Sequence, residues 1–312
     1  MKICQVRWDA CLLKGLTVLM LSSGSWALSS CKEDDGLNAG DPNYFTSSRG
    51  QFTATLDDGT TLFLIPGDAA GTATVTFDGS NPRHLAGVNN VSVSVTTYQG
   101  DLTIPSNVTG SDGKSYTITG IGAEAFMGCR NLTTLTLPST IEWIGDGAFC
   151  ICTTLTTINI PEGVTSLPST CFGECSLLSS VSLPSTLKLI GRMAFFKCKA
   201  LPTDGFTLPE GLEYIGELSF GECYGDKFRT ITIPASVKTI ADRAFGGREG
   251  SRLKINTYYM KSATPPTLEG VLYDVNADLS TPVTIHVPVG SKAAYEAANG
   301  WSSLTIEEDA SL

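Results

Sequence analysis

The sequence predicts an α/β solenoid, a right-handed stack of short parallel strands with a β-rich N-terminal cap and a small α/β C-terminal cap. Three observations predict it: a repeat of 23 residues in the middle of the chain, alternating apolar and polar residues within each repeat, and turn-rich segments on either side. A unit of this length cannot bury its apolar side chains alone, so successive units must stack to form a continuous core. We expect the caps at residues 49–117 and 261–312 and the repeats at 118–260.

A phenylalanine, in most units preceded by alanine, marks each repeat. The first four are separated by 23 residues each, and the last two follow at spacings of 25, so two later units carry insertions of two residues. These residues are Phe126, Phe149, Phe172, Phe195, Phe220 and Phe245. Because they share one position of the repeat, we expect their rings to stack along the core.

Each repeat contains two short extended segments and a turn. Leu135–Leu137, Ile158–Ile160 and Ile231–Ile233 alternate apolar and polar residues, which predicts a strand with one buried face. A proline follows each of them and ends the strand, since it cannot donate a ladder hydrogen bond. A second extended segment comes next, for example at 141–144 or 237–240. We expect a brief helical or 3₁₀ turn around the phenylalanine, and strands of successive repeats about 4.8 Å apart.

Five cysteines recur at the same position of the repeat, three residues after the phenylalanine. They are Cys129, Cys152, Cys175, Cys198 and Cys223. We interpret them as a ladder of small buried side chains, because a free cysteine behaves as a small hydrophobe. Disulfides and zinc binding remain alternatives in an oxidising compartment. Parallel side chains on neighbouring strands fit the disulfide dihedral poorly, however, and with Cys150 and Cys171 the number of cysteines in the repeats is odd.

Residues 1–30 have the pattern of an export signal. A basic start precedes an apolar run at 15–28, which is too short to span a bilayer stably. The sequence Leu28-Ser-Ser-Cys31 resembles a bacterial lipobox, which implies that Cys31 is diacylated and becomes the new N-terminus. The next four residues resemble the acidic signal that directs lipoproteins to the outer face of the outer membrane: Lys32, Glu33, Asp34 and Asp35. An ordinary secretory signal is the alternative. Residues 31–48 have the composition of a flexible tether.

The two ends of the stack need caps, because an open solenoid would expose its core and its strand edges. Alternating segments with turn signals predict a small β unit, either packed on the first repeat or forming a separate domain. These segments are 51–56, 61–65, 72–77 and 91–95. At the other end, 291–298 predicts a short helix, with Ser291 as its N-cap and Asn299-Gly300 as its stop.

The complete repeat pattern is Leu-x-x-Ile-x-Ile-Pro-x-x-Val-x-x-Ile-Gly-x-x-Ala-Phe-x-x-Cys. It resembles the BspA-like leucine-rich repeat family of bacterial surface proteins, from about residue 100 to residue 307. The resemblance implies a leucine-rich repeat solenoid and a role in adhesion or host-protein interaction, in some members with extracellular-matrix or plasma proteins. Leu167-Pro168 and Ile240-Ala241 depart from Ile-Gly, and Cys171 and Ser219 replace the alanine, but these changes conserve size.

Charge and residue content argue against several classes of function. The chain has 312 residues and a formal net charge of −10, whereas nucleic-acid binding needs clustered Lys and Arg. Only His84 and His286 are available for His-based catalysis or zinc chemistry, and no P-loop, HExxH or Gly-x-Ser-x-Gly motif is present. We therefore expect a protein that is not an enzyme and uses no cofactor or metal. A carboxylate pair for glycoside hydrolysis is the remaining catalytic alternative.

Binding is the function that such an architecture leaves open. The outward positions of the predicted strands form two columns of short polar side chains: Thr134, Thr136, Thr157, Asn159, Ser180, Ser182, Thr230 and Thr232. We add Tyr224, which lies in an insertion, and the pair Tyr258 and Tyr259, either of which can instead pack under the C-terminal cap. We expect a protein or glycan ligand at the cell surface, and membrane contact through the lipid anchor alone. A solvated sheet face in a structural envelope protein without a ligand is the alternative.

Overall fold

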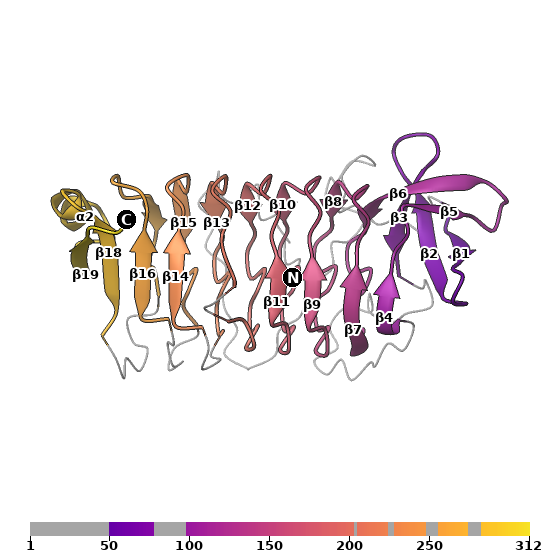
Figure 1. The fold of residues 1–312 in the computed structure, drawn as a ribbon, viewed down its shortest axis with the longest axis horizontal. Coiled ribbons are helices and arrows are strands. Elements are labelled where there is room, and N and C mark those ends of the chain that lie inside the picture. The colour runs from indigo at the N-terminus through magenta and orange to yellow at the C-terminus, as the bar shows by residue number, and fades with distance from the viewer. Residues whose placement is uncertain (1–49, 78–97, 203–204, 224–227, 248–254, 274–281) are drawn as a thin grey trace, which may run out of the picture.

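The computed structural model describes residues 50–77, 98–202, 205–223, 228–247, 255–273 and 282–312. They form an elongated stack in which the strands of successive repeats lie side by side, with one cap at each end (Figure 1). The solenoid expected from the repeats is confirmed. We call its three sides the front sheet, the back sheet and the turn side. Within the described residues, no helix is long and apolar enough to cross a membrane.

The N-terminal cap is a mixed sheet that continues into the repeats. It contains β1 (Phe52–Thr55), β2 (Thr61–Pro66), β3 (Thr72–Thr76), β5 (Asn107–Thr109) and β6 (Ser115–Ile121). β1, β2 and β3 pair in antiparallel order, β3 pairs in parallel with β6, and β5 pairs antiparallel to β6. β6 also pairs in parallel with β8 (Trp143–Ile144), so the cap is hydrogen-bonded to the first repeat. The segment 91–95, expected to be a strand, lies outside the described residues.

The front sheet is built from the segments with alternating residues. Its strands are β4 (Gln99–Thr103), β7 (Asn131–Thr136), β9 (Thr157–Asn159), β11 (Ser180–Ser182), β14 (Thr230–Ile233), β16 (Thr257–Met260), β18 (Thr284–Pro288) and β19 (Thr305–Asp309). β4 to β11 form one parallel four-stranded ladder and β14 to β19 a second, and the two follow one another along the stack (Figure 1). In β9 and β11 the middle residue is buried between two exposed ones, as period-two alternation requires.

The back sheet contains the second extended segment of each repeat. Its strands are β8, β10 (Ser166–Leu167), β12 (Leu189–Ile190), β13 (Tyr214–Ile215), β15 (Thr239–Ala241) and β17 (Thr267–Glu269), of which the last five pair in parallel in this order. Close packing requires the glycine that follows β8, β12 and β13. A Cβ added to Gly145, Gly191 or Gly216 would lie 2.3 to 2.8 Å from the backbone of the preceding repeat.

The turn side consists of the residues around each repeat phenylalanine. The sequence predicts a brief helical or 3₁₀ turn there. Thr170 and Glu174, two residues before and after Phe172, have φ angles of 52° and 63°. The N–H groups of Thr170, Phe172 and Glu174 donate to carbonyl groups of the next repeat, at N···O distances of 2.7 to 2.8 Å. The same positions are left-handed in neighbouring repeats, and nine of these residues are not glycine. The predicted helical or 3₁₀ turn is therefore found only in part: Gly173 and Cys175 donate to the carbonyl groups three residues before them, as in a 3₁₀ turn, but the left-handed residues send their N–H groups to the next repeat and form a third ladder.

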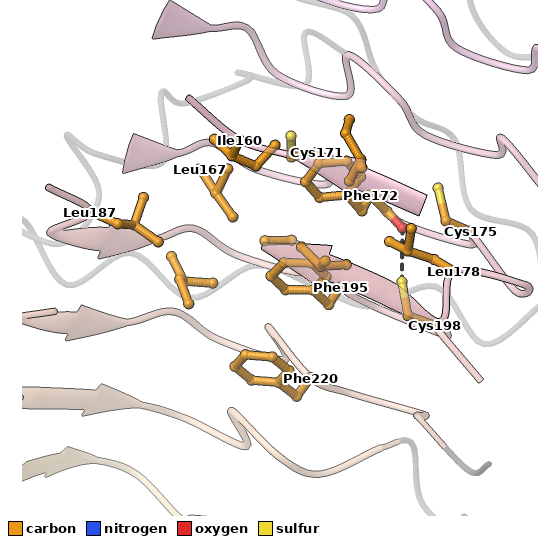
Figure 2. Packing of buried hydrophobic residues seen from close by; sticks show 14 of the residues in the cluster. Ile160, Leu167, Cys171, Phe172, Cys175, Leu178, Leu187, Phe195, Cys198 and Phe220 are labelled. Carbon is orange, nitrogen blue, oxygen red and sulfur yellow. Dashed lines mark hydrogen bonds between the residues drawn. The ribbon is translucent and has the colours of Figure 1, made fainter. Parts of the chain in front are cut away.

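The phenylalanines stack inside the core. Ring centroids lie 5.1 to 5.6 Å apart from one ring to the next, with interplanar angles of 7° to 19°, in the row Phe126, Phe149, Phe172, Phe195, Phe220 and Phe245. Figure 2 shows the third, fourth and fifth of these rings. Tyr98 packs on Phe126 at 4.9 Å, and Tyr258 packs edge-on to Phe245 at 5.4 Å. The row of rings is thus closed by a tyrosine at each end.

The cysteine ladder forms hydrogen bonds as well as filling space. The Sγ atoms of four cysteines donate to the carbonyl oxygen of the phenylalanine in the preceding unit, at 3.0 to 3.1 Å: Cys152, Cys175, Cys198 and Cys223. Figure 2 shows the bond from Cys198 to Phe172. Burial raises the pKa of each of these donor thiols, that of Cys223 to about 12, so the thiols stay protonated. The seven described cysteines are all free, and the described residues contain no cluster of three metal-ligating side chains.

The C-terminal cap packs a short helix, α2 (Lys292–Ala297), against β19. Ser291 occupies the N-cap position, but its backbone is already helical, with a ψ of −9°, and its hydroxyl donates to the carbonyl oxygen of Pro288. The carboxylate of Glu308 on β19 instead accepts from the N–H groups of Gly290 and Lys292, at 2.9 and 3.3 Å. Ser291 is thus the N-cap residue that the sequence predicts, but the carboxylate of Glu308, and not the hydroxyl of Ser291, accepts from the N–H groups at the helix start.

Candidate binding face

The outward residues of the front sheet form two columns. The first column holds Asp101, Thr134, Thr157, Ser180, Thr230, Thr257, Thr284 and Thr305, and the second holds Thr103, Thr136, Asn159, Ser182, Thr232, Tyr259, His286 and Glu307. Between the columns, each strand contributes one buried aliphatic or aromatic residue to the core. The structure thus places outward all eight hydroxyl and amide residues predicted for this face. Their role in binding stays a prediction.

Tyr258 does not belong to this face. Its side chain is fully buried, and its Cα pairs in register with Ile231 and Ile285, which point into the core. Side chains of adjacent strand residues point to opposite faces of a sheet, so Tyr258 and Tyr259 cannot both face outward. The prediction of Tyr258 as a contact residue is therefore wrong, and its ring ends the phenylalanine row. Tyr224 lies outside the described residues, as do Cys31 and the acidic stretch 32–35.

Tyr259 stacks on a histidine that the sequence analysis did not assign to this face. The rings of Tyr259 and His286 are nearly parallel, with centroids 4.9 Å apart and an interplanar angle of 18°. His286 pairs in register with Glu307 on the last strand. The second column therefore changes from short polar side chains to a tyrosine, an imidazole and a carboxylate. Alternation in Ile285-His286-Val287 was the sequence signal that could have placed His286 outward beside Tyr259.

The front sheet is acidic at both ends. Asp101 accepts hydrogen bonds from the hydroxyls of Thr134 and Thr133, at 2.6 and 2.8 Å, and these bonds lower the pKa of its carboxyl group. At the other end, hydrogen bonds from the side chain and backbone of Ser311 lower the pKa of Asp309, with a smaller effect from the charge of His286. Both side chains are therefore carboxylates at neutral pH.

Several charged and aromatic side chains of the back sheet contact neighbouring residues of that sheet. Glu213 pairs with Lys238 at 2.5 Å and with Lys188 at 3.9 Å, and the interactions with Lys238 are the main cause of its lowered pKa. Trp143 lies across the backbone of Gly120, where an added Cβ would lie 2.3 Å from the indole ring. These ion pairs and this aromatic contact join strands of the same sheet. The front sheet is therefore the better candidate for binding a partner.

A hollow lies where the N-terminal cap meets the front sheet. It has a volume of about 310 Å³, and its lining includes Thr61, Phe63, Tyr98 and Leu102. Its lining carries no carboxylate, imidazole or thiol. Nothing in it corresponds to the carboxylate pair that glycoside hydrolysis requires.

Stacked short repeats with one parallel strand on each of two sheets, and aliphatic residues at fixed positions, define a leucine-rich repeat solenoid. Residues 119–250 match the family model described as BspA type leucine rich repeat region, in six copies. Residues 119–250 are therefore leucine-rich repeats of the BspA type. Solenoids of this kind present extended surfaces that are used for binding.

Solved structures of bacterial repeat proteins are similar to this chain. One is a leucine rich cell surface protein from Faecalibacterium prausnitzii A2-165, with 24% identity, a TM-score of 0.52 and coverage of 82% of this chain and 54% of that one. Others are leucine-rich repeat proteins from Bacteroides ovatus (21% identity, TM-score 0.45, coverage 80% and 75%) and T. pallidum (20%, 0.47, 85% and 97%). The first similarity supports the fold, and this chain spans about half of that structure. No curated protein sequence matches the chain.

Proposed function

We propose that this protein is a non-enzymatic adhesion module that binds a protein partner, of the host or its matrix, on the front sheet. The observation that carries the proposal is the pair of outward columns, where hydroxyl and amide side chains stand in register on neighbouring strands within each of the two parallel ladders. Such side chains can donate and accept hydrogen bonds, and the ladder hydrogen bonds hold their backbone in place. A long partner segment can therefore contact many repeats at once.

A glycan is the second candidate ligand. It is supported by the half-buried ring of Tyr259. The ring of His286 stacks on one face of this ring, with the centroids 4.9 Å apart. Aromatic rings at the end of a surface rich in hydroxyl groups suit a sugar as well as a planar side chain. A structural envelope protein without any ligand is the third possibility.

Charge substitutions on the two sheets test the binding proposal. Thr157→Lys with Ser182→Lys should weaken binding by about tenfold or more, because two long cations would displace a ligand from the centre of the columns. Thr165→Lys with Ser166→Lys is the matched control, since both residues are exposed in the back segment of the same region. Binding of the chain from residue 31 onward, with Cys31→Ala, is measured on an array of matrix proteins, plasma proteins and glycans. Equal losses in the two double variants would contradict a front-sheet site.

We also propose that the protein is anchored to the outer membrane through Cys31 and exposed on the cell surface. Cys31→Ala should move the protein from the membrane fraction to the soluble fraction, because the acyl chains would be missing. Replacing residues 32–35 with neutral residues should leave it in the membrane but protected from protease added to intact cells. Unchanged fractionation of the Cys31→Ala variant would rule out the lipid anchor.

A further inference from the structure

In the second column of the front sheet, the row of short polar side chains ends at the aromatic ring of Tyr259. The centroid distance between Tyr259 and His286, 4.9 Å, is close to the spacing of neighbouring strands, about 4.8 Å, so the two rings stand one behind the other on the sheet. His286 thus covers one face of the Tyr259 ring. The other face is directed toward Thr232, the register partner of Tyr259 on β14. Thr232 is exposed, and its short side chain cannot cover a phenol ring.

The charged residue of the second column nearest to this ring is an acid. Glu307 is the register partner of His286, and Asp101, the other charged residue of the two columns, is also a carboxylate but lies at the far end of the face. The described lysine nearest in sequence to Tyr259 is Lys261, which pairs with Glu210. Lys292, on the helix α2 of the C-terminal cap, pairs with Glu296. The chain as a whole has a net charge of −10. The potential over this end of the sheet therefore attracts cations.

We propose that the open face of the Tyr259 ring binds the guanidinium group of an arginine in the partner. This proposal rests on the proposed function, since it assumes that a protein lies on the front sheet. A guanidinium is planar, stacks on aromatic faces, and carries five N–H donors for which the hydroxyl oxygen of Thr232 is an acceptor. A lysine ammonium matches the charge but not the flat ring, and a neutral sugar carries no positive charge for the carboxylates to attract. Tyr259 would thus set the register of the partner on the columns.

Short labelled peptides test this proposal without the natural partner. We would measure fluorescence anisotropy at low salt with acetyl-Gly-Arg-Gly-Arg-Gly-amide and with the matching lysine peptide, using the mature chain. The arginine peptide should bind about two- to fivefold more tightly than the lysine peptide. Tyr259→Thr, which repeats the residue of the neighbouring strand, should abolish this preference, whereas Tyr259→Phe should keep it. Asp101→Asn, at the far end of the face, should affect both peptides equally.

Several results would overturn the proposal. They are equal binding of the two peptides, an arginine preference that survives Tyr259→Thr, and a neutral oligosaccharide whose binding depends on Tyr259 while the peptides do not bind. If the peptides fail but the front-sheet lysine variants still abolish partner binding, the arginine proposal alone is wrong. If the peptides behave as expected but those lysine variants have no effect on the partner, the front-sheet function is wrong.

Discussion

Raising the pH from 7 to 10 should strongly destabilise the repeat stack. Burial raises the pKa of six cysteine thiols in the folded protein: Cys150, Cys152, Cys171, Cys175, Cys198 and Cys223. An unfolded thiol has a pKa of about 8.5, so above that pH the unfolded chain loses protons that the folded protein retains. Because the folded pKa is the higher one, the thiols favour folding below pH 8.5 and lose this contribution as the pH rises. At pH 10 the loss is about 2 kcal/mol per thiol.

Urea unfolding at both pH values, with a reductant and without oxygen, measures this effect. The triple variant Cys152→Ser, Cys175→Ser, Cys198→Ser is the control, because serine can still donate to the phenylalanine carbonyl but does not ionise in this range. Its free energy of unfolding should fall only about half as much between pH 7 and pH 10, because three of the six thiols remain. An equal pH dependence in the two proteins would show that the ladder thiols do not couple folding to pH.

Phe172→Ala should lower the free energy of unfolding by about 3–5 kcal/mol. Phe172 is fully buried in the middle of the row, with its ring centroid 5.1 Å from that of Phe149 and 5.4 Å from that of Phe195. Removing the ring leaves a cavity between two repeats, and repeat proteins depend on the interfaces between neighbouring units. Chemical denaturation followed by circular dichroism measures the loss.

Leu177→Ala is the matched control for this substitution. Leu177 lies five residues further along the same repeat and is 52% exposed, so its truncation should change the free energy of unfolding by no more than about 0.5 kcal/mol. Similar losses in the two variants would mean that the stacked rings contribute no more than a surface side chain.

The fold was predictable because its signals repeat. Alternation in segments such as Ile158–Ile160 sets which residues face the core, and a common spacing brings the phenylalanines and cysteines into rows. The left-handed turn positions had no such signal. Glycine marks two of them, Gly128 and Gly147, but Ile151 occupies the position equivalent to Gly128 in the next repeat with a φ of 62°. A β-branched residue there gives no hint of that conformation, which is held by the hydrogen bonds between repeats.

The binding face was predictable in part for the same reason. Its short polar residues follow from alternation, and so does the choice between Tyr258 and Tyr259 once the strand is assigned. The stack of Tyr259 on His286 was not predictable from local pattern alone, because the two residues are 27 positions apart and meet through the register of β16 and β18. The thiol hydrogen bonds likewise depend on the orientation of a carbonyl group in the preceding repeat.

Hydrogen–deuterium exchange of the protein bound to a partner found on the array tests the central claim most directly. Side chains of the front sheet should be covered, so amides flanking the front strands, in the turns after β7, β9, β14 and β16, should become protected on binding. Segments of the back sheet such as β10, β12 and β13 should exchange as in the free protein. Protection confined to the back sheet or the turn side would contradict a binding face on the front sheet.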